Sequence, residues 1–99
     1  MSHYIATNFN TPIPALYEQQ DSDEIIAKAI YYVPYSDWKW IVLEFSKLQN
    51  LFYCYVLPEQ EYQYVTIDKL IQMAYEYDVE VILDTDFVPK PLKELINEV

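Results

Sequence analysis

The chain has 99 residues, 53% of them hydrophobic, and its 16 carboxylates outnumber six basic residues to give a formal net charge of −10. This length and apolar content predict one folded domain rather than a disordered acidic tail. The charge disfavours direct binding to nucleic acid or to an anionic membrane, and it favours a basic partner. The sequence has no glycine and no arginine. It therefore lacks the glycine-rich phosphate-binding loops and the bidentate guanidinium groups on which nucleotide sites usually depend.

In the first third of the chain, the sequence predicts an irregular segment, a short helix and a strand. Residues 1–12 show no clear periodic pattern. A helix of one or two turns is predicted over residues 14–19, since proline suits the first turn of a helix. Residues 24–33 fit either a helical stripe or a strand, and their β-branched and aromatic content, which ends at Pro34, favours a strand.

The middle of the chain predicts an antiparallel meander. Residues 38–45 and 51–57 are rich in β-branched and aromatic side chains, which is typical of strands. Turn-forming residues precede and separate them at 34–37 and 46–50. Strands joined by short polar links form a meander, and residues 62–65 predict a further short strand.

The last third predicts a helix, a strand and a second helix. Thr66 suits the N-cap of a helix that reaches about Tyr75. The apolar residues of this helix repeat at i, i+3, i+4 and i+7: Ile67, Leu70, Ile71 and Ala74. Residues 79–83 predict a strand, and a terminal helix is predicted to begin near Pro91.

These elements predict an α+β fold over residues 1–99 as a single domain. We expect a small antiparallel sheet, a meander of three to five strands, with two or three short helices packed on it.

Four short motifs occur in a recognisable order: PALY at 14–17, SDWKW at 36–40, YVTIDKL at 64–70 and FVPKPLKE at 87–94. Their order and spacing resemble a small family known as domain of unknown function 2958, over roughly residues 13–95. The resemblance implies an origin on plasmids, conjugative elements or phages, and it supports the strand at residues 24–33. The family tends to carry glycines where this chain has Cys54, Pro58 and Gln63. The resemblance supplies no catalytic residue.

The sequence predicts no catalytic, cofactor-binding or metal site, and we expect no enzyme. His3 is the only histidine and has no orienting neighbour, as general-base catalysis would need. Cys54 is the only cysteine and lies mid-strand among aromatic residues, which is typical of a small buried hydrophobe. If strand geometry continues past Leu83, Asp84 and Asp86 share one face. A solvated acidic face is the favoured interpretation of that pair over a weak divalent-cation site.

The chain predicts a cytoplasmic protein. A single cysteine excludes an internal disulfide and suits a reducing compartment. The N-terminal residues show no signal-peptide pattern, and the longest apolar runs are far shorter than a membrane span.

Aromatic side chains could form a platform that stacks single-stranded bases. The candidates are Trp38, Trp40, Tyr53 and Tyr55. Such platforms normally lie in basic grooves, whereas this chain is strongly acidic. Core packing is therefore the favoured interpretation of most of these rings, and we expect no direct contact with nucleic acid.

Carboxylates interleaved with tyrosines are the most informative pattern. The predicted partner-binding residues are Glu59, Glu61, Tyr62, Tyr64, Glu76, Tyr77, Asp78, Glu80, Asp84 and Asp86. Spaced carboxylates can stand in for phosphates in a basic groove, and tyrosines supply contact area at low entropy cost. We expect a non-enzymatic protein that inhibits a basic, nucleic-acid-handling host defence protein by mimicry.

Two alternatives stay open. The acidity can be an ordinary solvated surface encoded by an AT-rich gene. The exposed aromatics can instead form an oligomer interface, which would make the protein a structural or accessory subunit.

Overall fold

The computed structural model describes Ile13 and residues 25–96. Its elements in chain order are β1 (Ile26–Ala27), β2 (Ala29–Tyr32), β3 (Lys39–Ser46), β4 (Leu51–Leu57), β5 (Glu61–Thr66), α1 (Ile67–Tyr77), β6 (Ile82–Leu83), β7 (Lys90–Pro91) and α2 (Leu92–Ile96). The predicted irregular segment 1–12 and the predicted helix at 14–19 lie outside the described residues.

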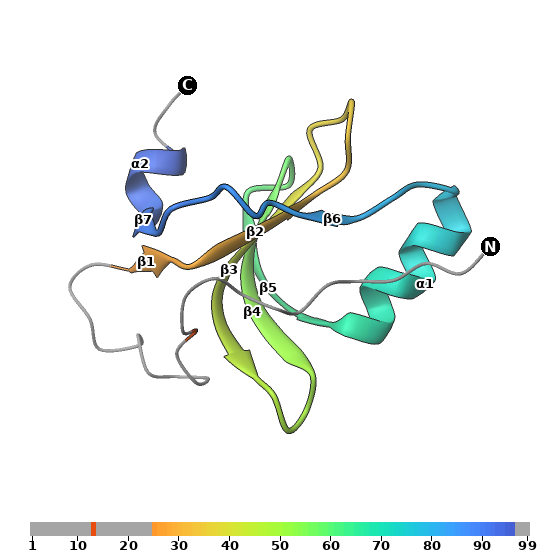
Figure 1. The fold of residues 1–99 in the computed structure, drawn as a ribbon, viewed down its shortest axis with the longest axis horizontal. Helices are drawn as coiled ribbons and strands as arrows, with labels where there is room; N and C mark the ends of the chain where they lie inside the picture. Colours follow the sequence, from red (N-terminus) through yellow and green to blue (C-terminus); the bar gives the residue numbers. More distant parts are fainter. Residues whose placement is uncertain (1–12, 14–24, 97–99) are drawn as a thin grey trace.

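A five-stranded antiparallel sheet forms the centre of the fold, with the strand order β5-β4-β3-β2-β6. The strands β2 to β5 are neighbours in chain order, so the predicted meander is confirmed. β1 and β7 pair as a separate two-stranded sheet beside α2 (Figure 1). The described residues therefore form a small antiparallel sheet with two short helices.

Two predicted strands differ from the structure. The segment 24–33 is divided at Lys28, because β1 pairs with β7 whereas β2 pairs with β3. The strand predicted at 79–83 is reduced to β6, which pairs with Tyr31 and Tyr32. After Leu83 the chain turns, and the amide of Asp86 donates to the Asp84 side chain at 3.0 Å. The condition under which Asp84 and Asp86 would share one face of a strand is therefore not met.

Helix α1 has the predicted start and the predicted buried face. The Thr66 hydroxyl accepts a hydrogen bond from the amide of Lys69 at 3.0 Å and so caps the first turn. Leu70 and Ala74 are buried, and Ile67 and Ile71 pack beside them. The helix ends at Tyr77, and its C-cap, Asp78, has a left-handed backbone conformation with φ of 54°.

The two faces of the sheet carry two separate cores, because successive side chains of a strand point to opposite sides. On one face Tyr31, Phe52 and Cys54 pack with α1. On the other, Ile41 and Leu43 pack with Leu92 of α2. Figure 1 shows the two helices on opposite sides of the sheet. No helix among the residues described is long and apolar enough to cross a membrane.

Candidate functional site

The topology gathers exposed carboxylates at one end of the sheet. In an antiparallel meander, the β2–β3 and β4–β5 turns lie at the same end. The end of α1 joins them, since the rings of Trp38 and Tyr77 are 5.3 Å apart at an edge-to-face angle. We call this region the acidic end, defined by the exposed carboxylates Asp37, Glu59, Glu61, Glu76, Asp78 and Glu80. Lys39 is the single lysine of the described chain that lies there.

The structure brings together six of the ten predicted partner-binding residues. Five are carboxylates of the acidic end, and the sixth is Tyr77, which is exposed beside them. The other four lie elsewhere. Tyr62 and Tyr64 are exposed on the sheet face opposite α1, and Asp84 and Asp86 lie in the turn after β6, at the far edge of the sheet.

Carboxylates at the end of α1 oppose the electrostatics of the helix. Its last turn contains no basic residue, and Glu76 and Asp78 lie where the macrodipole favours positive charge. Each such charge costs about 0.3–1 kcal/mol at an exposed helix end. These two carboxylates therefore lower the stability of α1 slightly.

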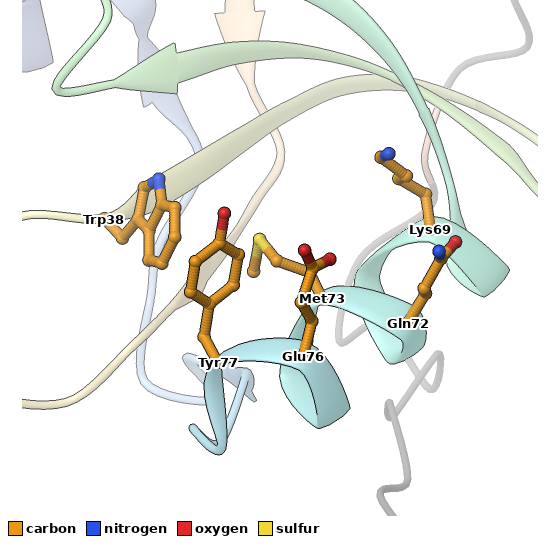
Figure 2. A pocket seen from close by; sticks show the side chains of 6 residues that line it. All are labelled: Trp38, Lys69, Gln72, Met73, Glu76 and Tyr77. Atoms are coloured by element: carbon orange, nitrogen blue, oxygen red, sulfur yellow. The ribbon is translucent and has the colours of Figure 1, made fainter.

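A hollow of about 180 Å³ lies beside the acidic end. Figure 2 shows the five lining side chains of α1 on one side of the helix. The sixth lining residue, Trp38, directly precedes β3. The lining consists of Trp38, Lys69, Gln72, Met73, Glu76 and Tyr77. Lys69 lies at the opposite end of this row from Trp38 and Tyr77.

Sequence reasoning missed the hollow and three of its residues, Lys69, Gln72 and Met73. The signal was present, because the five helical lining residues recur at i, i+3, i+4, i+7 and i+8 and must share one side of a helix. The contribution of Trp38 is tertiary and has no comparable local signal.

Four tyrosines form a second surface feature, on the sheet face opposite α1. We call Tyr53, Tyr55, Tyr62 and Tyr64 the tyrosine cluster. The ring centroids of three pairs lie 4.9 to 5.8 Å apart: Tyr53 with Tyr62, Tyr53 with Tyr64, and Tyr55 with Tyr62. Tyr62 and Tyr64, on the edge strand β5, are 47% and 51% exposed. The base-stacking platform, which the sequence disfavoured, is not formed as one surface, because Trp38 and Trp40 lie on the α1 face and Tyr53 and Tyr55 on the other. All four rings pack in or against a core, as the favoured interpretation predicted.

A β-bulge places a carboxylate against the tyrosine cluster. The register shifts between Val42 and Glu44, and Glu44 pairs with Tyr53 while remaining only 4% exposed. Burial is the main cause that raises the pKa of Tyr53 above its ordinary value, and the charges of Tyr62 and Glu44 add to it. The Tyr53 hydroxyl therefore loses its proton at a higher pH than an exposed tyrosine does.

The sequence offered three kinds of candidate for catalysis or metal binding: Cys54, the acidic side chains and His3. Cys54 is fully buried and burial raises the pKa of its thiol, so it is the small core residue that the sequence predicted. Over Ile13 and residues 25–96, no three side chains of the metal-ligating types come together. His3 lies outside the described residues.

No protein-family model, no curated protein and no solved structure matches this chain. The family that the sequence motifs resemble therefore remains a prediction.

Proposed function

We propose that this protein is a non-enzymatic, cytoplasmic inhibitor from a mobile element, which binds a basic, nucleic-acid-handling host defence protein through its acidic end. The observation that carries the proposal is the gathering of six exposed carboxylates against one lysine at one end of the sheet. Such a surface attracts a groove that normally holds phosphates, because complementary potentials steer encounter and fix register.

The shape of the acidic end supports a protein partner rather than a metal ion. Its carboxylates come from two turns, the first residue of β5, the end of α1 and the segment that follows α1, so they are spread over a surface instead of converging on one point. The exposed ring of Tyr77 lies among them. Tyrosine is enriched in protein interfaces, and the surrounding carboxylates supply the charge complementarity that a basic partner requires.

Capture from a lysate of the candidate bacterial host tests this proposal. The tagged protein is incubated at low salt, and the proteins released at moderate salt are identified by mass spectrometry. We expect one basic nucleic-acid-handling protein, displaced also by added duplex DNA because both ligands compete for the same groove. A captured protein that DNA does not displace would contradict mimicry.

The tyrosine cluster favours a second candidate function, a structural subunit. Tyr62 and Tyr64 present aromatic surface on β5, whose outer side has no strand partner among the described residues. An edge strand of this kind can pair with another chain. The solution mass, measured by light scattering, separates the two functions. A stable oligomer that Tyr64→Lys dissociates would favour the structural subunit, whereas a monomer favours the inhibitor.

A further inference from the structure

The hollow beside the acidic end is too small for a typical small-molecule ligand. Its volume of about 180 Å³ lies below the range of roughly 300–1,000 Å³ that is usual for such sites. It is open at the surface, on the same side of α1 as Glu76. A hollow of this size suits one side chain of a partner protein.

The lining is divided into an apolar wall and a polar row. Trp38, Tyr77 and the thioether of Met73 form the wall, where the two rings meet edge to face. Glu76 and Gln72 supply a carboxylate and an amide on the polar side. The occupant that this combination fits has a flat or aliphatic body and a positively charged, hydrogen-bonding head.

Arginine matches that description better than lysine does. A guanidinium stacks on aromatic rings and binds a carboxylate through two parallel hydrogen bonds, whereas an ammonium is a compact and strongly hydrated charge. The acidic end adds a negative field around the hollow. Lys69 is the only cation of the lining, and it lies seven residues before Glu76, about 10 Å away along the helix axis.

We propose that this hollow is a socket for a single arginine side chain of the partner, stacked on Trp38 and Tyr77 and paired with Glu76. The socket rests on the proposed function, since it assigns the anchoring residue of the basic partner. Within the interface it would act as a buried aromatic and arginine contact, the type of contact that contributes most to binding energy.

The test uses NMR of the ¹⁵N-labelled full chain and three probes: Nα-acetyl-arginine amide, Nα-acetyl-lysine amide and Nα-acetyl-citrulline amide. Citrulline keeps the shape of arginine without its charge. We expect arginine to shift the indole N–H signal of Trp38 saturably at millimolar concentration, with lysine weaker and citrulline at least about tenfold weaker. Signals from α2 serve as a reference for diffuse attraction.

Two matched variants locate the site. Glu76→Gln removes the carboxylate of the hollow, and Glu94→Gln removes an exposed carboxylate from α2. Arginine affinity is expected to fall about three- to fivefold in the first variant and to stay unchanged in the second, as expected for one partly exposed ion pair. Lys69→Glu is expected to raise the affinity, because it replaces the cation of the lining with a second carboxylate.

Equal weakening by Glu76→Gln and Glu94→Gln, or equal shifts from arginine and citrulline, would overturn the socket. That result leaves the proposed function standing if the captured basic protein is still displaced by duplex DNA. Conversely, a specific arginine effect at Trp38 without a captured nucleic-acid-handling partner would keep the socket and overturn the proposed function.

Discussion

The two ends of the sheet differ in charge. At the acidic end, six exposed carboxylates accompany one lysine. At the other end, the amide of Ile67 donates to the carbonyl of Asn50 and joins α1 to the β3–β4 turn. Among the residues that the structure describes, two exposed lysines in this turn and the first turn of α1, Lys47 and Lys69, accompany one exposed carboxylate, Asp68. The proposed function would account for this difference, because a binding surface concentrates charge at one end of the sheet, whereas acidity that serves only solubility has no reason to do so.

The two ends of α1 also differ in whether their polar and charged residues stabilise the helix. At the start of α1, Thr66 caps the helix and Asp68 lies in the first turn, where negative charge is favourable. At its end, Glu76 and Asp78 add negative charge where positive charge is favourable. The residues at the start of α1 therefore stabilise the helix, whereas the two carboxylates at its end oppose it.

The largest expected effect comes from the core that holds the two ends together. Leu70 is 1% exposed between α1 and the sheet, so Leu70→Ala should lower the free energy of unfolding by about 2–5 kcal/mol. Gln72→Ala, on the exposed side of the same helix, should change it by less than about 0.5 kcal/mol. Urea denaturation followed by circular dichroism measures both. Similar losses in the two variants would contradict the packing described here.

Loss of the helix cap should have a smaller effect. Thr66→Ala removes the hydroxyl that accepts from the amide of Lys69 and should cost about 1 kcal/mol. Thr66→Ser keeps the hydroxyl and serves as the control, which should retain most of the stability. If serine and alanine prove equally destabilising in thermal denaturation, the methyl group rather than the cap is responsible.

A pair of charge-neutralising variants compares the stability contributions of carboxylates at the two ends of α1. Asp78→Asn should raise the free energy of unfolding and Asp68→Asn should lower it, each by about 0.3–1 kcal/mol, because the two carboxylates lie at opposite poles of α1. Asparagine tolerates the left-handed backbone of position 78 as aspartate does. Both effects should shrink at 1 M salt. Effects of the same sign would contradict the dipole argument.

The smallest expected effect concerns alkaline pH. The folded pKa of Tyr53 lies above the unfolded value of 10.0, so the unfolded chain loses this proton first as the pH rises. The stability linked to Tyr53 is therefore intact below about pH 10 and declines as the pH rises toward the folded pKa. Tyr53→Phe should make the decline in the free energy of unfolding shallower, without moving the pH at which the decline begins. Denaturation curves between pH 8 and pH 11 measure it, and identical slopes would contradict the assignment.

The sequence predicted the elements whose pattern is local. Residues 51–57 coincide with β4 because side chains of this segment pack alternately in the two cores and the strand is bounded by turn residues. The division at Lys28 had no local signal, since it depends on pairing of β1 with β7, more than 60 residues later in the chain. β6 was predicted too long because only long-range pairing with β2 determines its extent.

The candidate site was predicted residue by residue but not as a surface. Exposed carboxylates and tyrosines could be chosen by residue type, yet the meander decides that Glu59 lies at the same end as Glu76, and that Asp86 does not. The burial of Glu44 depends on a bulge that no sequence pattern indicated. Local chemistry was thus accessible, and its assembly required the topology.

The most direct test of the central claim compares two variants of identical net charge. Glu59→Lys with Glu80→Lys alters the acidic end outside the hollow, and Asp86→Lys with Glu94→Lys alters two exposed carboxylates elsewhere. The measurement is the affinity of each for the captured basic partner at moderate salt, by isothermal titration calorimetry. We predict a loss of at least about 30-fold for the first variant, about 2 kcal/mol or more, and less than threefold for the second. Equal losses would show that only net charge matters and would contradict the account.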